Sequence, residues 1–372
     1  MRIGLNLLYL LPGIVGGTET YAAGLLAGLA KIDRDDEFVV FVNRETENRP
    51  LPEVENFTRV VCPVRAVSRA RRYFYEQVRL SGLLKAHGVD LVHSLGYVAP
   101  LFPPCPSVLT VPDINFRAFG DQMSLVKRLA LRFFTQQSAC RADHVITISD
   151  FARSQIHLEL GIPEAQITVT HLAASAISVD DTSLAAVMQK YGIKQPYIIA
   201  FSSFSPHKNI LRLLQAFARA RRDYELPHQL VLLGHRVAGE RNDTQMEAGV
   251  FTGFVDGASK YALLKGAELL VFPSTYEGFG LPVLEAQQVG LPVVCSTAAS
   301  LPEVAGDAAI FFNPLSVDEM AKAIGQVARG ANLRTTLKQK GFQNAGKFSW
   351  EQTAQLTLEV YKNILPGSGS VR

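Results

Sequence analysis

The sequence predicts an α/β protein whose parallel sheets are covered by helices, arranged in two domains. Apolar segments of strand length alternate with amphipathic segments of helix length along all 372 residues, which is the pattern of parallel sheets. The length itself suits two domains of about 100 to 200 residues each. With 48% hydrophobic and 19% charged residues, the chain can build a sizeable core, which excludes a disordered or collagen-like protein.

The expected strands form two series, separated by a stretch of small and polar residues. The first series is residues 3–7, 38–42, 91–93, 108–111, 145–148 and 167–170, and the second is 197–201, 230–233, 269–272, 292–295 and 309–312. Because the stretch 173–192 lies between them, we expect an N-terminal domain over residues 1–175 and a C-terminal domain over 190–348. A final helix is expected at 350–366, with Ser349 as its N-cap.

Several classes of protein do not fit this sequence. Charged and helix-breaking residues interrupt every long apolar run, so we expect no membrane-spanning helix. Pro12 and Gly13 break the apolar N-terminus, which we interpret as a buried strand and not as a signal peptide. The four cysteines form no C-x-x-C pair, as in cytoplasmic proteins with reduced thiols and no metal site. A net charge of +3 is too small for a general nucleic-acid-binding domain.

The most informative segment is LLVFPSTYEGFGLPVLEA, residues 269–286. It reads as a buried strand, a loop and a helix that begins near Leu281. Gly278 and Gly280 allow the backbone to approach a ligand closely, and the helix N-terminus offers N–H groups to an anion such as a pyrophosphate. Glu285 lies one turn into this helix with its side chain directed back toward the N-terminus, where it can accept hydrogen bonds from a ribose diol.

Glu277 and Glu285 have the spacing E-x7-E, which brings two carboxylates to the same opening at different depths. One can face a sugar ring and the other a nucleoside. The structural alternative is a turn followed by a helix-capping glutamate. Two glycines and Pro282 directly after a buried strand favour the ligand site over that alternative.

EGFGLPVLEA resembles the E-x7-E signature of retaining glycosyltransferases of the GT-B fold, family 4. Three more segments resemble blocks of this family: GGTETYAAGLLAGL (16–29), SFSPHKNILRLLQAF (203–217) and SLPEVAGDAAIFFNP (300–314). The resemblance implies two Rossmann-like domains with parallel sheets facing across a cleft. It also implies that the first domain binds the acceptor, that the second binds the nucleotide sugar, and that the C-terminal helix packs back on the first.

The implied reaction is transfer of a hexose from a nucleotide diphosphate sugar to a hydroxyl of a glycan or lipid-pyrophosphate-linked acceptor, with retained configuration, in surface polysaccharide synthesis. Neither a cofactor nor a metal is implied. The SPHKN variant resembles mannosyl- and rhamnosyltransferases, so GDP-mannose is the expected donor. The residues that match the family's catalytic positions are Glu277, Lys208 and Asp113. Those that match donor-binding positions are Gly16, Gly17, Ser203, His207, Lys208, Val255, Gly278, Phe279, Gly280, Leu281 and Glu285, and those on the acceptor side are His93 and Tyr21.

The sequence departs from the family at two places. Pro112 stands before Asp113 where the family commonly has a histidine that orients the reacting sugar. Ser203 and Phe204 stand in place of a Gly-Arg pair, and His207 in place of an arginine. The phosphate clamp therefore rests on Lys208 with less cationic support. Asp113 and His93 each follow a buried strand at the edge where open α/β sheets bind ligands, although a buried, hydrogen-bonded histidine is an equal reading of His93.

The segment RAVSRARRYFYEQVR, residues 65–79, combines five arginines with three aromatic residues. It is either a solvated helix face or an interfacial patch that holds a peripheral enzyme on anionic headgroups. The second reading suits a lipid-linked acceptor and a cytoplasmic protein on the inner face of the cytoplasmic membrane.

Three other functions stay open. A nucleotide-sugar epimerase of the same fold would release a free sugar without an acceptor. A non-catalytic sugar-nucleotide-binding protein would bind the donor only, and Pro112 keeps this alternative open. A nicotinamide oxidoreductase is the third, but the first glycine loop is not G-x-G-x-x-G.

Overall fold

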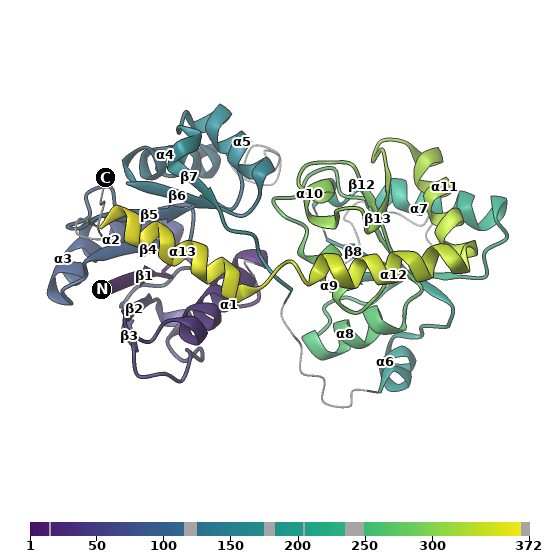
Figure 1. The fold of residues 1–372 in the computed structure, drawn as a ribbon, viewed down its shortest axis with the longest axis horizontal. Helices are drawn as coiled ribbons and strands as arrows, with labels where there is room; N and C mark the ends of the chain where they lie inside the picture. Colours follow the sequence, from purple (N-terminus) through teal and green to yellow (C-terminus); the bar gives the residue numbers. More distant parts are fainter. Residues whose placement is uncertain (15, 115–124, 175–182, 204, 235–248, 366–372) are drawn as a thin grey trace. The chain divides into compact units, whose positions relative to one another are not determined.

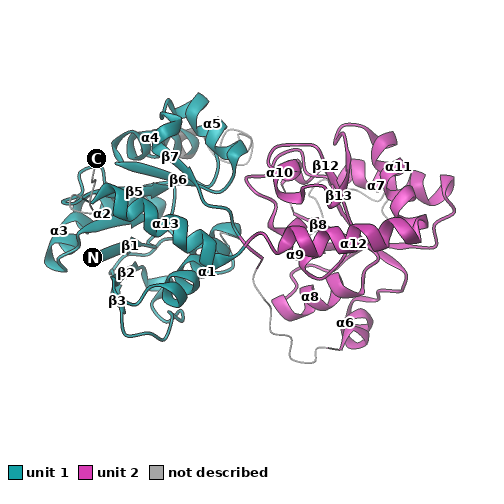
Figure 2. Cartoon of the chain, viewed as in Figure 1, with its two compact units in different colours: residues 1–172, 349–372 teal, residues 173–348 magenta. Residues whose placement is uncertain are grey.

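The computed structural model describes the chain except for residues 15, 115–124, 175–182, 204, 235–248 and 366–372. The chain forms two compact units (Figure 2). The first contains residues 1–172 and 349–372, and the second contains residues 173–348. Each unit has one parallel sheet with helices on its faces, so the predicted α/β class is confirmed.

The first unit contains a seven-stranded sheet in the order β3-β2-β1-β4-β5-β6-β7. Its strands are β1 (Arg2–Asn6), β2 (Glu37–Val42), β3 (Phe57–Val61), β4 (Leu91–Ser94), β5 (Ser107–Thr110), β6 (His144–Thr147) and β7 (Ile167–Val169). The sequence analysis missed β3. This strand lies at the edge of the sheet, where half of its surface faces solvent and Thr58 and Arg59 interrupt the apolar pattern.

The helices of the first unit are α1 (Gly17–Ile32), α2 (Arg69–Val78), α3 (Leu80–Ala86), α4 (Leu125–Arg141), α5 (Asp150–Leu160) and α13 (Trp350–Ile364). The C-terminal helix α13 lies along α1 (Figure 1). The contact depends on two glycines of α1. A Cβ atom on Gly24 would lie 2.2 Å from the Trp350 ring, and one on Gly28 would lie 2.3 Å from the Trp350 carbonyl oxygen. A side chain at either position would clash with Trp350, so only glycine fits there.

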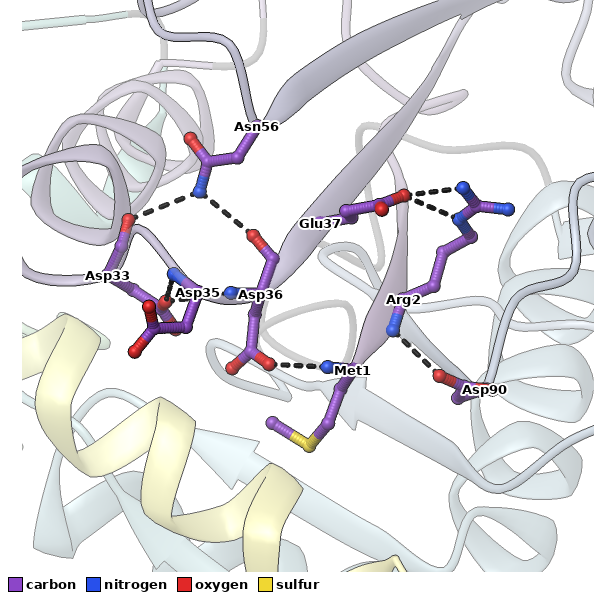
Figure 3. A network of polar contacts seen from close by, with 8 residues as sticks. All are labelled: Met1, Arg2, Asp33, Asp35, Asp36, Glu37, Asn56 and Asp90. Atoms are coloured by element: carbon purple, nitrogen blue, oxygen red, sulfur yellow. Dashed lines mark hydrogen bonds and ion pairs between the residues drawn. The ribbon is translucent and has the colours of Figure 1, made fainter.

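A polar network holds the amino-terminal edge of the first sheet (Figure 3). The Met1 amino group donates to Asp36 at 2.6 Å, and the Arg2 backbone N–H donates to Asp90 at 2.7 Å. Asn56 donates from Nδ2 to the carbonyl oxygens of Asp33 and Asp36. These contacts fix the starts of the strands, so the opposite, carboxyl-terminal edge is left for a site.

The second unit contains a six-stranded sheet in the order β10-β9-β8-β11-β12-β13. Its strands are β8 (Tyr197–Ser202), β9 (Gln229–Gly234), β10 (Gly249–Phe251), β11 (Leu269–Phe272), β12 (Val293–Ser296) and β13 (Ala309–Phe312). Its helices are α6 (Leu184–Tyr191), α7 (Ile210–Asp223), α8 (Gly257–Gly266), α9 (Leu281–Gln288), α10 (Leu301–Ala305), α11 (Val317–Arg329) and α12 (Ala331–Ala345). The sequence analysis missed β10, which is short and half-exposed at the edge.

Helix α6 packs against α8, and a Cβ atom on Gly266 would lie 2.5 Å from the side chain of Leu184. The helix is therefore part of the second unit, which begins at residue 173, earlier than the expected position 190.

The core of the second unit has two layers because successive residues of a strand face opposite sides of the sheet. Ile198 of β8 lies in the layer under α7 and α11, and Ile199 lies in the layer under α8 and α9.

Candidate functional site

The strongest candidate site lies where β8 and β11 end. These strands are neighbours in the sheet, and the later strands of the unit continue on opposite sides of them, with β9 and β10 beyond β8 and β12 and β13 beyond β11. Such a reversal of strand order leaves a crevice at the carboxyl ends, which is where open α/β sheets bind ligands. The loop after β8 carries Lys208, and the loop after β11 carries Glu277.

Lys208 and Glu277 form an ion pair across these two loops. Lys208 ends the short 3-10 turn Pro206–Lys208, and its Nζ lies 2.6 Å from Oε1 of Glu277, 69 residues away in sequence. Both side chains are largely buried, with 19% and 14% of their surface exposed. Nζ also lies 5.1 Å from the centre of the Phe272 ring. The site therefore holds one cation that can meet an anionic phosphate and one carboxylate that can face a developing positive charge.

A glycine turn leads from Glu277 into helix α9. Gly280 has a φ of 109°, a left-handed conformation that favours glycine, and a Cβ atom there would lie 2.7 Å from Cδ2 of Leu301. Helix α9 begins at Leu281 with Pro282 in its first turn. The N–H groups of this turn and the helix dipole favour an anion at the mouth of the loop.

Glu285 of α9 lies near this helix N-terminus but already has a partner. Its Oε1 accepts from Nζ of Lys260 at 2.6 Å, and the two side chains are 18% and 25% exposed. Lys260 belongs to α8. Val255 is half-buried immediately before Asp256, which caps α8 by accepting from the Ser259 N–H at 2.8 Å. The sequence analysis missed Lys260, because a lone lysine on a helix has no distinguishing pattern.

His207 supplies no second cation to the site. Burial and, to a smaller extent, the neighbouring Lys208 lower its pKa to about 4, and Glu277 only partly opposes this. The imidazole is therefore neutral near pH 7, and Lys208 alone carries positive charge in this turn. Ser203 accepts from the Ser205 N–H at 3.2 Å, while Phe204 lies outside the described residues.

The first unit contains the remaining expected site residues. Gly16 precedes α1 with a φ of 56°, and among the residues that the structure describes, chain neighbours aside, none has an atom within 4 Å of where a Cβ of Gly16 or Gly17 would lie. Asp113 follows β5 and accepts from the Tyr97 hydroxyl at 2.9 Å. The structure thus pairs Lys208 with Glu277 and Lys260 with Glu285 in the second unit, and it places Gly16, Gly17 and Asp113 at the carboxyl-terminal end of the first sheet.

His93 and Tyr21, the residues expected on the acceptor side, lie in the core, which is the buried reading that the sequence also allowed for His93. Both side chains are buried, and the hydroxyl of Thr110 joins them, at 2.7 Å from Nε2 of His93 and 3.0 Å from the Tyr21 oxygen. Nδ1 of His93 lies 2.6 Å from the Tyr361 hydroxyl of α13. Burial lowers the pKa of His93 to about 3, so the ring is neutral. These groups form a hydrogen-bonded core that ties α1 and α13 to the sheet, and an acceptor in solvent cannot touch them.

The arginine-rich segment is only partly a surface. Arg72 is buried and lies 3.6 Å from Glu76, and Tyr73 packs on the Phe134 ring, so neither belongs to an exposed patch. The remaining exposed residues of the segment are cationic or apolar, and some of them, with Arg44 of the 3-10 turn Arg44–Thr46, line a cavity of about 610 Å³. The exposed residues that line it include Arg65, Arg71 and Phe74, together with Arg44. Among the helices that the structure describes, none has both the length and the apolar content to cross a bilayer.

The chain resembles known proteins in both units. The family model "Glycosyltransferase Family 4" matches residues 15–174, and "Glycosyl transferases group 1" matches residues 186–344. One similar protein is the O-antigen chain mannosyltransferase B of Escherichia coli, which is 35% identical over 238 residues. This match covers 61% of the present chain and 62% of that protein, so the chain spans less than two thirds of that relative.

Two solved structures share the fold of this chain. HepE of Anabaena, in complex with UDP and glucose, has a TM-score of 0.72 at 18% identity, with 98% of this chain and 100% of that chain covered. WaaG, a glycosyltransferase involved in lipopolysaccharide biosynthesis, has a TM-score of 0.70 at 15% identity, with the same coverage of both chains. At these identities the likeness shows the fold alone, which is the expected GT-B pair of α/β units.

Proposed function

Because the chain belongs to glycosyltransferase family 4, as its two matching family models show, we propose that it transfers a hexose from a nucleotide diphosphate sugar to an acceptor hydroxyl. The acceptor is a glycan or a lipid-linked sugar of surface polysaccharide synthesis, and the anomeric configuration is retained. The observation that carries this proposal is the Lys208–Glu277 ion pair, at 2.6 Å, beside the glycine turn and the N-terminus of α9.

The chemistry needs a stabilised leaving group and a stabilised sugar cation. Lys208 and the amides at the start of α9 hold the diphosphate, which gains negative charge as the anomeric C–O bond breaks. The Glu277 carboxylate faces the positive charge that develops on the sugar ring. The acceptor oxygen forms its bond to the anomeric carbon on the face that the phosphate leaves, and its proton passes to the departing phosphate oxygen. No side-chain base is needed, so Pro112 is compatible with activity.

The donor is proposed to be GDP-mannose. The support is the 35% identity to a protein named as a mannosyltransferase. A UDP-sugar is the competing donor, because HepE, which shares the fold, holds UDP and glucose. Glu285 is proposed to bind the ribose, which both donors contain, and Val255 is proposed to contact the base. No resident metal is part of this proposal, so activity should survive EDTA.

The acceptor is proposed to bind the first unit near Gly16, Gly17 and Asp113. The exposed arginines and Phe74 of the 65–79 segment are proposed to hold the protein on anionic lipid at the cytoplasmic face of the membrane, where a lipid-linked acceptor would be presented.

A screen of GDP-, UDP-, dTDP- and ADP-sugars tests the function. A ligand that binds only the native protein raises its unfolding temperature. Stabilisation by one nucleotide family, with slow release of its diphosphate, would support the transferase and name the donor. Release of an epimerised free sugar would instead indicate an epimerase, binding without turnover would indicate a binding protein, and no shift with any donor would contradict the proposal.

A further inference from the structure

Two buried serines, one at the end of β12 and one after it, hold the loop that carries Glu277. The Ser296 hydroxyl donates to the Ser274 carbonyl oxygen at 2.5 Å. The Ser300 Oγ lies 2.9 Å from the carbonyl oxygen of Glu277 and 2.8 Å from that of Phe279. Both serine side chains are fully buried. The 273–280 loop is therefore fastened through three of its carbonyl groups to the next strand-helix connection.

These bonds also set the direction of the loop's N–H groups. Across a trans peptide the C=O and the following N–H point in opposite directions. Since the carbonyls of Glu277 and Phe279 point at Ser300, the N–H groups of Gly278 and Gly280 point away from it.

The first residues of the 273–280 loop show what lies on the side opposite the serines. The Ser274 carbonyl faces Ser296, and the next N–H, that of Thr275, points the other way and donates to the His207 carbonyl at 2.8 Å. His207 belongs to the turn that carries Lys208. At this peptide, the side opposite Ser296 is therefore the side that contacts the turn carrying Lys208.

The loop is also supported from the side of Ser300. Leu301, the next residue, lies so close to Gly280 that a Cβ atom there would be 2.7 Å from its Cδ2. The hydrogen bonds from Ser300 and the contact with Leu301 therefore restrict the conformation of the glycine turn. Without the hydroxyl, the Glu277 and Phe279 carbonyls lose the one donor that they share, and either can turn its negative end toward the site.

We propose that Ser300 is a positioning residue for the donor diphosphate: its hydroxyl, shared between the Glu277 and Phe279 carbonyls, fixes the turn so that the Gly280 amide is presented to the phosphate. Ser300 acts through the loop and does not itself touch the donor. The inference rests on the proposed function, since it assumes that a nucleotide diphosphate binds at this loop. The loop carries Glu277, which faces the sugar, so its amides adjoin the sugar-bearing β-phosphate.

The test compares a diphosphate with a monophosphate. Calorimetry would give the dissociation constants of GDP and GMP, and of UDP and UMP, for the wild type, Ser300→Ala and Ser300→Thr. Loss of hydrogen bonding to a charged phosphate should weaken diphosphate binding by about tenfold or more in Ser300→Ala and leave monophosphate binding nearly unchanged. Ser300→Thr keeps the hydroxyl and should restore the wild-type ratio.

Ser138→Ala is the matched control, because Ser138 is a buried serine of the first unit that donates to the Ala99 carbonyl and accepts from its N–H. It should lose stability without a change in the nucleotide ratio. Should Ser300→Ala not fold, Ser300→Cys, with the same shape and a weak donor, should show the same selective loss. An unchanged diphosphate-to-monophosphate ratio in a folded Ser300 variant, or equal losses of both nucleotides, would overturn the role of Ser300. Failure of the wild type to bind any nucleotide would overturn the proposed function and this inference with it.

Discussion

The Nζ atom of Lys208 lies 2.6 Å from Oε1 of Glu277, and the pair joins the loops that follow two adjacent strands. Lys208 and Glu277 are paired with each other in this structure, so a bound diphosphate must compete with Glu277 for the ammonium group of Lys208. His207, which lies beside Lys208 in the same turn, is neutral near pH 7 and does not replace its charge. The pair is therefore the most informative place to change a charge.

Lys208→Met and Glu277→Gln should each lower kcat by on the order of a hundredfold or more, because each removes a charge that stabilises the transition state. Steady-state kinetics with the donor found in the screen measures this. The control is the exposed pair Lys340–Asp307 of the same unit, at 2.8 Å, changed to Lys340→Met and Asp307→Asn without loss of rate. A wild-type rate in either Lys208→Met or Glu277→Gln would remove that residue from the mechanism.

Glu285→Gln should weaken the binding of nucleoside diphosphate and monophosphate equally, by about tenfold, because both contain the ribose that Glu285 is proposed to hold. This contrasts with the selective effect expected at Ser300. Calorimetry with both nucleotides measures it, and Asp318→Asn, an exposed charge removal in the same unit, serves as the control. A loss confined to the diphosphate would show that Glu285 acts on the phosphate and not on the ribose.

Acidification should destabilise the first unit through His93. Its folded pKa of about 3 lies below the usual 6.5, so the unfolded chain binds one more proton between these values and the free energy of unfolding falls as pH decreases. The limiting slope is about 1.4 kcal/mol per pH unit. Glu76, whose pKa burial raises to about 7, acts in the opposite direction above its unfolded pKa.

The His93 contribution is the difference between the wild type and His93→Gln, since Glu76 is common to both. Trp350 is the single tryptophan and lies in the first unit, so its fluorescence follows the unfolding of that unit alone. Urea titrations between pH 7.5 and 5 should show a steeper loss of stability in the wild type than in the variant. Parallel curves would mean that His93 titrates normally in the folded protein.

Gly24→Ala should destabilise the docking of α13 on α1 by several kcal/mol, because the added Cβ atom would lie 2.2 Å from the Trp350 ring. Gly82→Ala in α3 is the matched control. No atom lies within 4 Å of its Cβ position, so alanine should raise helix stability there by up to about 1 kcal/mol. Trp350 fluorescence during denaturation measures both. Equal stabilities of the two variants would contradict the close packing of these helices.

Replacing Arg65, Arg69 and Arg71 with glutamine should weaken binding to anionic liposomes at low salt while donor hydrolysis continues, since these exposed arginines lie in the first unit. Arg72 is left unchanged because it is buried beside Glu76. The charge-matched control replaces Arg221, Lys265 and Lys322 of the second unit, which are also exposed. Unchanged liposome sedimentation in the first triple variant would leave the segment as a solvated helix face.

The buried strands of both sheets and the strand-loop-helix unit around Glu277 could be predicted from the sequence, because continuous apolar runs and the glycine and proline positions are local signals. Strands β3 and β10 could not, since both lie at half-exposed sheet edges. The paired E-x7-E carboxylates were found by their spacing, whereas their partners depend on tertiary structure. Lys260 lies 25 residues before Glu285, and no local pattern connects them.

His93 illustrates the limit more sharply. A histidine at the carboxyl end of a buried strand has the same sequence signal whether it binds a ligand or completes a core. The deciding neighbour is Tyr361, 268 residues later, and only the return of α13 brings it within 2.6 Å. Arg72 is the opposite case, since its i,i+4 relation to Glu76 was legible in the sequence and favours pairing.

The return of α13 has a consequence for biosynthesis. The second unit is inserted within the first, so the ribosome makes residues 173–348 before it makes the helix that covers α1. Translation proceeds at about 5 to 20 residues per second. The surface of Gly24 and Gly28 on which Trp350 packs therefore stays uncovered for roughly 9 to 35 s after residue 172 has been made. During that interval the face of α1 that carries Gly24 and Gly28 is not covered by α13, while the second unit, which is continuous in sequence, can already fold.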